Sequence, residues 1–298
     1  MRRIPVFSVA LRRLAAGLVI ACGLAGAAAA APALWAVKDA DSTIYLFGSM
    51  HVLEPHVQWR TPVFDAAYAK SSAIWFETDV NALTDKAKMD ELVKRYGMDP
   101  EHPLSAKLSP DYRAALKARL DAAGVSTAGM DRLRPWMASL VLTILPFRTQ
   151  GFDPKAGADA VLNRAASADK KPVRAFETAE TQARFLADLP EPVQVQLLED
   201  ALTTDARSFA DIKAVQTAWL AGDIVKLGPM LLEEMKAQRP ELYEALIRQR
   251  NRAWAQVIAN EMGGAGVEMV DVGALHMVGD DGLPALLAAR GFKVERVQ

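Results

Sequence analysis

The chain has 298 residues, of which 51% are hydrophobic and 24% are charged, and this balance excludes an intrinsically disordered or collagen-like protein. Its 35 lysines and arginines stand against 36 aspartates and glutamates, a formal net charge of −1. That balance does not favour nucleic acid as a partner. A single cysteine excludes an intrachain disulfide framework and any cysteine-rich metal site.

The first 31 residues have the pattern of a secretory signal peptide. Four arginines within residues 1–13 precede an uncharged run over residues 14–37, and alanines at 27–31 offer several A-x-A cleavage sites. The run is rich in alanine and glycine rather than in large apolar residues, which argues against a transmembrane helix. We therefore expect cleavage near Ala31, no stable membrane span afterwards, and a periplasmic or secreted protein.

Two other interpretations of this segment stay open. The residues Val19-Ile20-Ala21-Cys22 fit the lipobox of a bacterial lipoprotein, in which Cys22 would carry the lipid. The sequence after Cys22 stays apolar, unlike the polar tether of a lipoprotein, so we favour the cleaved signal peptide. The second alternative is an uncleaved membrane anchor. If cleavage falls near Ala31, the mature chain has no cysteine, which suits an oxidising compartment.

Short apolar and β-branched runs predict strands near both ends of the mature chain. The polar residues 38–42 between the first two runs predict a hairpin. The runs 73–76 and 267–272 are typical of buried strands. The expected strands cover residues 34–37, 43–47, 73–76, 173–176, 267–272 and 292–297.

Helical periodicity and capping residues occupy the chain between these strands. Thr61-Pro62 can start a helix, and Ser109 is a good N-cap for another. The expected helices cover residues 62–70, 83–96, 110–123, 134–145, 157–168, 178–189, 192–202, 205–220, 241–262 and 284–290.

The alternation of strands and helices at both ends predicts the α/β fold class. We expect a mostly parallel central sheet that is built from both chain ends. The helical stretches 83–145 and 178–262 look like inserted helical subdomains. Residues 32–298 would then form a single domain.

Two short motifs each occur twice, directly after or at the end of predicted strands. Gly-x-x-His ends at His51 and at His276, and Phe-Glu-Thr is centred on Glu77 and on Glu177. The carboxyl ends of parallel strands share one edge of a sheet, so these four side chains should converge in one crevice. The glycine before each histidine would let the chain turn sharply off its strand.

Two histidines and one glutamate are a sufficient ligand set for a catalytic divalent metal with an open coordination position. The second glutamate could act as a general base toward water. Each motif alone recurs easily by chance, and a strand-end glutamate can simply cap the next helix. The coincidence favours a functional site, because the chain has only four histidines and two of them share this context. His56 and His102 lie in loop-like sequence, where we expect them at the surface.

Arg250 interrupts the apolar stripe of the expected helix 241–262, with Asn251 beside it. An arginine on such a stripe must find buried partners, face a cleft, or extend its charged end past the edge of the core. This helix leads into the strand before His276, so we favour a role for Arg250 and Asn251 in the same site. The rest of the stripe consists of Tyr243, Ile247, Trp254 and Ile258.

Several other active-site classes are excluded by the sequence. It contains no G-x-S-x-G nucleophile elbow, no P-loop and no H-E-x-x-H motif. Cys22 lies in the signal region and is no candidate nucleophile. The glycine-rich residues 263–266 follow a helix and precede a strand, the reverse of the order that a dinucleotide-binding loop requires.

The chain resembles the TraB/PrgY/GumN family, which includes the Tiki proteases. The resemblance rests on the opening run 44–53, on the ending 272–283 and on the closing run 291–294. The middle agrees in Phe176-Glu177-Thr178 and in Arg250-Asn251-Arg252-Ala253-Trp254. Both G-x-x-H motifs are intact, and the resemblance covers essentially the whole mature chain.

This resemblance implies an exported protein whose fold is similar to that of erythromycin esterases and haem-binding ChaN proteins. The Tiki branch implies a metal-dependent peptidase that uses Mn²⁺ or Co²⁺, with Zn²⁺ a further option. The matching positions supply the expected metal ligands His51, Glu77 and His276. They also supply the expected catalytic residues Glu177, Arg250 and Asn251, although which glutamate binds metal and which acts as base stays open.

We therefore expect an exported metal-dependent hydrolase, a peptidase by class, that acts on a peptide or another small substrate of the cell envelope. The PrgY-type members imply an alternative, because they act on peptide pheromones by a mechanism that need not include cleavage. In that alternative the protein is non-catalytic and sequesters a peptide, haem or saccharide in the same cleft.

Overall fold

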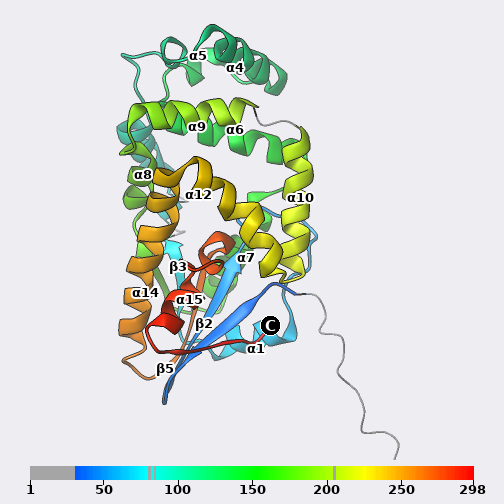
Figure 1. Ribbon diagram of the computed structural model, residues 1–298, viewed down its shortest axis with the longest axis vertical. Coiled ribbons are helices and arrows are strands. Elements are labelled where there is room, and N and C mark those ends of the chain that lie inside the picture. The colour runs from blue at the N-terminus through cyan, green and yellow to red at the C-terminus, as the bar shows by residue number, and fades with distance from the viewer. Residues whose placement is uncertain (1–30, 80–81, 84, 204–205) are drawn as a thin grey trace, which may run out of the picture. The chain divides into compact units, whose positions relative to one another are not determined.

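A six-stranded sheet lies at the centre of the computed structural model, which describes residues 31–79, 82–83, 85–203 and 206–298 (Figure 1). The predicted signal peptide and its alternatives at Cys22 fall outside the described residues. The strand order is β4-β3-β5-β2-β1-β6. The strands are β1 (Leu34–Lys38), β2 (Ser42–Ser49), β3 (Ile74–Thr78), β4 (Val173–Glu177), β5 (Gly266–Gly273) and β6 (Lys293–Arg296).

The sheet is mostly parallel and joins both ends of the chain, as predicted. β2, β5, β3 and β4 run parallel, while at one edge the hairpin strand β1 pairs antiparallel with β2 and the strand β6 pairs antiparallel with β1. The register of β2 against β5 places Ser49 opposite Gly273, the last residues of the two strands. The segments that follow these strands and carry the two histidines therefore leave the sheet at the same edge.

Helices occupy most of the remaining chain, and the predicted caps are confirmed. The Thr61 hydroxyl accepts the Phe64 N–H, and the Ser109 hydroxyl accepts the Tyr112 N–H. The helices are α1 (Pro62–Lys70), α3 (Lys86–Leu92), α4 (Pro110–Ala123), α5 (Thr127–Met130), α6 (Pro135–Thr149), α7 (Ala158–Ala168), α8 (Ala179–Ala187), α9 (Glu191–Thr203), α10 (Ala206–Leu220), α11 (Ile224–Gly228), α12 (Glu234–Gln238), α13 (Pro240–Tyr243), α14 (Gln249–Glu261) and α15 (Leu283–Ala289).

The expected helix 241–262 is not one regular helix. α13 passes into a π-helical turn over Glu244–Arg248 before α14 begins at Gln249. A π turn has a wider hydrogen-bonding ring and rotates the residues that follow it, and such turns recur at functional sites. Here the turn immediately precedes Arg250 and Asn251.

Apolar side chains on the two faces of the sheet build two separate cores. On one face Phe47 packs against Trp59, Phe64 and Trp219, with ring centroids between 4.7 and 6.1 Å apart. On the other face Leu46 and Val270 lie under α14 and α15. Because neighbours in a strand point to opposite faces, Phe47 and its neighbour Leu46 serve different cores.

A third core lies entirely within the helices. It joins α4, α6 and α9, and so combines residues from both stretches that the sequence marked as helical insertions. Among the other helices of the second stretch, α10 and α14 pack on the two faces of the sheet. In the part of the chain that the structure describes, no helix is long and apolar enough to cross a membrane.

Candidate active site

Four predicted side chains meet at the carboxyl edge of the sheet. Glu77 belongs to β3 and Glu177 ends β4, while His51 and His276 follow β2 and β5. The Oε1 atom of Glu77 lies 3.8 Å from Nε2 of His51 and 3.7 Å from Nε2 of His276. The two histidines thus face the same carboxylate oxygen, as the argument from strand ends predicted.

Each histidine ring is oriented through its other nitrogen. Nδ1 of His51 lies 3.0 Å from Oδ2 of Asp159, and Nδ1 of His276 lies 2.6 Å from Oδ1 of Asn251. Both oxygens are acceptors, so each Nδ1 carries a hydrogen and donates it. In the neutral form of each ring, the Nε2 lone pair then faces Glu77.

Opposite environments shift the pKa values of the two histidines in opposite directions. Burial of His276, together with the nearby positive charge of Arg250, lowers its pKa to about 3 against the opposing charge of Glu77. Withdrawal of solvent also acts to lower the pKa of His51. There the hydrogen bond and charge of Asp159 outweigh it and raise the pKa to about 9. At neutral pH these shifts favour a neutral His276 and, while no cation is bound, a protonated His51, which a cation at its Nε2 would deprotonate.

Arg250 is buried and points to the site, where its donors are already engaged. It donates from Nε and Nη2 to the two oxygens of Glu177, at 2.8 Å each, and from Nη2 to Oε2 of Glu77 at 2.6 Å. Its Nη1 lies 3.3 Å from Nε2 of His276 and donates to the Leu246 carbonyl at 3.2 Å. Of the three options expected for an arginine on an apolar stripe, Arg250 has taken the first, because its buried partners are the carboxylates of Glu77 and Glu177.

Glu177 and Asn251, both predicted to be catalytic, contact other side chains of the site. Glu177 accepts hydrogen bonds from Arg250, from Nε1 of Trp254 at 3.0 Å and from Gln182 at 3.3 Å. Asn251 orients His276 and donates to the Asp281 carbonyl at 2.7 Å. Their roles in a reaction remain predictions.

The glycine of the second G-x-x-H motif creates space at the point where the ligands meet. A Cβ atom on Gly273 would lie 3.1 Å from Oε1 of Glu77 and 3.2 Å from Nε2 of His51. Its N–H donates to that same oxygen at 2.6 Å. Neither Gly273 nor Gly48 has a positive φ angle, so these positions do not depend on the conformational freedom of glycine. The close approach of neighbouring atoms requires them instead.

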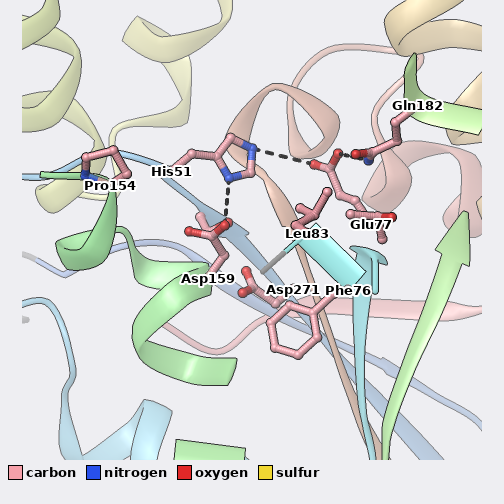
Figure 2. Close-up of a pocket in the computed structure, with 10 residues that line it drawn as sticks. His51, Phe76, Glu77, Leu83, Pro154, Asp159, Gln182 and Asp271 are labelled. Atoms are coloured by element: carbon pink, nitrogen blue, oxygen red, sulfur yellow. Dashed lines mark hydrogen bonds and ion pairs between the residues drawn. The ribbon is translucent and has the colours of Figure 1, made fainter. Parts of the chain in front are cut away.

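A pocket of about 350 Å³ opens beside these groups (Figure 2). Figure 2 shows His51 between Asp159 and Glu77, with Asp271 next to Asp159 on the floor of the pocket. The lining residues are Ser49, His51, Phe76, Glu77, Thr78, Leu83, Pro154, Asp159, Gln182 and Asp271.

Asp159 and Asp271 are the pocket residues that the sequence argument missed. Asp271 is 1% exposed, and neither of its carboxylate oxygens has a hydrogen-bond partner among the described residues. Burial, and after it the charge of Asp159, raise the pKa of Asp271 well above its ordinary value. The nearby Ser49 hydroxyl acts in the opposite direction, although it donates its hydrogen bond to the Val272 carbonyl at 3.4 Å. An acid in the apolar run 267–272 was a signal that could have identified Asp271.

The two remaining histidines lie at the surface, as expected. His56 is exposed in a loop, and His102 is exposed and bonds to Asp99 at 2.9 Å. The apolar stripe of the helix before β5 is buried at Tyr243, Ile247, Trp254 and Ile258.

The donor atoms at the sheet edge fit a divalent cation by type. Two imidazole nitrogens and one carboxylate oxygen, with the empty side of Gly273 next to them, match a three-ligand catalytic site. Arg250 occupies part of this space. Within the described ranges, no group of three or more His, Cys, Asp or Glu side chains is placed to hold a metal ion as it stands.

With two G-x-x-H segments and two glutamates at the carboxyl edge of its sheet, the chain is an α/β protein whose polar site lies at the ends of parallel strands. The chain belongs to the TraB/PrgY/gumN family, whose model matches residues 33–296. It is similar to the uncharacterized protein YbaP of Escherichia coli strain K12 and of Shigella flexneri, each 29% identical over 187 residues, or 62% of this chain and 67% of YbaP. No solved structure matches the chain.

Proposed function

We propose that this chain is an exported metal-dependent hydrolase, a peptidase by class. One observation carries the proposal: Nε2 of His51 and Nε2 of His276 both face Oε1 of Glu77, at 3.8 and 3.7 Å, while an acceptor holds each Nδ1. Histidines that bind metal characteristically donate the other ring hydrogen to a carboxylate or carbonyl oxygen. Family membership and the predicted export signal support the same proposal.

His51, Glu77 and His276 would hold the cation, with Mn²⁺ or Co²⁺ expected and Zn²⁺ as a further option. A divalent cation at these donors supplies a Lewis acid that polarises a scissile carbonyl group and lowers the pKa of water. The protein contributes the positions of these donors. Asp159 and Asn251 fix the two rings, and the Gly273 N–H fixes Glu77.

Glu177 and Arg250 form the buried support beneath these donors. The bidentate pair holds the guanidinium under Glu77, and the Arg250 guanidinium carbon lies 4.5 Å from the Trp254 ring centroid. Burial acts against ionisation of Glu77, but interactions with His276, Arg250 and His51 outweigh it and lower its pKa to about 2. The carboxylate is therefore ionised, as a metal ligand must be.

The rival function is a non-catalytic protein that sequesters a peptide, haem or saccharide in the same pocket. One observation favours it: Arg250 bonds to both glutamates and approaches His276, so a cation must share this space with a guanidinium. In this function the ligand leaves the pocket chemically unchanged.

The test combines metal titration with peptide cleavage on the purified mature protein after chelation. We expect stoichiometric binding of Mn²⁺ or Co²⁺ by calorimetry and cleavage of a peptide library by mass spectrometry. His51→Ala, His276→Ala and Glu77→Gln should lose both, while the surface variant His102→Ala should keep both. If no metal binds and all variants equal the wild type, the proposal fails. A ligand recovered intact at one equivalent would establish the rival. Fractionation of cells that express the full chain tests export separately.

A further inference from the structure

The pocket beside the sheet edge contains more acid than the proposed metal site uses. Among the described residues, four buried side-chain oxygens of its lining have no hydrogen-bond partner: both of Asp271, Oδ1 of Asp159 and Oγ1 of Thr78. A buried carboxylate without a partner is costly, and native proteins keep few of them. Unsatisfied acceptors grouped on one pocket wall indicate a missing donor.

The protein itself supplies only a small part of the opposite charge. His51 reaches Oδ2 of Asp159, the oxygen that is already bonded, and Arg250 is bonded to the two glutamates and does not line the pocket. No lysine or arginine occurs among the described residues that line it. Of the described lining residues, His51 alone can carry a positive charge, and it bonds to Oδ2 of Asp159, so both oxygens of Asp271 and Oδ1 of Asp159 stay without a partner.

The remaining wall of the pocket is apolar. Phe76, Leu83 and Pro154 line it, and the volume of about 350 Å³ exceeds what a single ion requires. Such a space suits a short aliphatic segment that ends in a charge.

We propose that this pocket binds a primary ammonium group of the substrate, with Asp271 and Asp159 as its anchors. An ammonium group has three hydrogens to donate, which matches unsatisfied oxygens on Asp271, Asp159 and Thr78. The ammonium is either the amino terminus of a peptide or a lysine side chain. This inference rests on the proposed function, because His51 and Glu77 line the same pocket and would place the adjacent bond beside the proposed metal donors.

The experiment measures binding without turnover, in the presence of a chelator. Two matched pairs of probes separate the sources: Ala-Ala amide against its N-acetylated form, and N-acetyl-lysine amide against N-acetyl-norleucine amide. Calorimetry or ligand-observed NMR on the mature protein should show that the amine of at least one pair binds about tenfold or more tightly than its neutral partner.

Variants of the acidic wall complete the test. Asp271→Asn preserves side-chain size, and it should abolish the preference for the amine while leaving binding of the neutral probe unchanged. Asp121→Asn, which removes an exposed acid of α4 that pairs with Lys117, is the matched control and should keep the preference. If Asp271→Asn fails to fold, Thr78→Val provides the second variant, with a smaller loss of amine binding expected.

Three results would overturn the inference: equal binding of amine and neutral probes, no binding of any probe, or a preference that survives Asp271→Asn. Metal binding that is lost in Asp271→Asn and kept in Asp121→Asn would also overturn it, in favour of a metal site. The outcomes stay separate from the proposed function. If the protein binds amines but neither binds metal nor cleaves peptides, the proposed function fails and the protein is a sequestering protein. If it cleaves peptides without a preference for amines, only this inference fails.

Discussion

The two G-x-x-H segments share a motif and a place at the sheet edge, but their histidines lie in different surroundings. The His276 side chain is 5% exposed and its ring lies 4.5 Å from that of Trp254, whereas 57% of the His51 side chain is exposed to the pocket. An amide orients the first ring and a carboxylate orients the second. One ring is therefore buried, neutral and fixed in place, whereas the other is largely exposed and lines the pocket.

Removing each histidine ring should produce the largest difference between the two segments. We expect both His276→Ala and His51→Ala to abolish metal binding and turnover, but only His276→Ala to lower the free energy of unfolding substantially. His276→Ala leaves Asn251 without its bond and opens a cavity beside Trp254, at a cost of about 2–4 kcal/mol, whereas His51→Ala should cost under about 1 kcal/mol. Urea unfolding of the metal-free proteins measures the difference. Equal losses of stability would show that the two environments are energetically alike.

Exchanging the acceptors should have the next largest effect. Asp159→Asn removes the charge that raises the pKa of His51 and should move that pKa from about 9 toward its ordinary value of 6.5. The variant should also weaken metal binding by roughly 10–100-fold, the usual effect of losing such a partner. NMR titration of the His51 ring measures the first effect and calorimetry the second. An unchanged titration curve would contradict the assigned role of Asp159, and Asp121→Asn serves as the control.

The glycines of the two motifs should respond differently to a methyl group. In Gly273→Ala the added carbon meets Glu77 and His51, so we expect loss of metal affinity with little change in unfolding free energy. In Gly48→Ala it meets Met277 Cγ at 2.8 Å and the Ala274 Cα at 3.0 Å, which should cost about 1–3 kcal/mol of stability. Parallel thermal unfolding and metal titration separate the two outcomes. A stability loss at Gly273 as large as that at Gly48 would contradict the assignment.

The smallest expected effect is the pH dependence of stability in the metal-free protein. Glu77 has a lowered pKa, so its contribution is present above its ordinary value of 4.5 and is lost as pH falls through about 2. His51 has a raised pKa, so its contribution is present below 6.5 and is lost as pH rises through about 9, with solvent screening at this exposed ring. A plot of unfolding free energy against pH should change less with pH on the acid side in Glu77→Gln, and less on the alkaline side in Asp159→Asn, than in the wild type. Unaltered curves in both variants would contradict these directions.

The sequence predicted what depends on strand direction. His51, Glu77, Glu177 and His276 could be placed together because each follows a strand or lies at its carboxyl end, and parallel strands end at a common edge. That argument needs only local patterns and one general rule of topology. The family resemblance, now shown over residues 33–296, selected the same residues.

What the sequence could not predict depends on contacts between distant backbones. Asp159 reaches His51 because the start of α7 lies against the loop that carries His51: the Ala158 N–H donates to the Met50 carbonyl at 2.9 Å. A Cβ on Gly157 would lie 2.3 Å from the His51 carbonyl oxygen, so only glycine permits this approach. The pairing of Arg250 with both glutamates was equally invisible, since it depends on three separate elements and on the π turn before α14.

The pairing of β2 with β5 also determines when the protein can become functional during its synthesis. β2 forms early in the chain, but its parallel partner Gly266–Gly273 follows far later in the sequence. Until β5 emerges, His51 and Glu77 lack the strand between them, and β2 presents an unpaired edge. Such distant pairing is slow to form because a long loop must close first. A chain that ends before β5 would therefore have neither a complete sheet nor the meeting of His51, Glu77 and His276 at its edge.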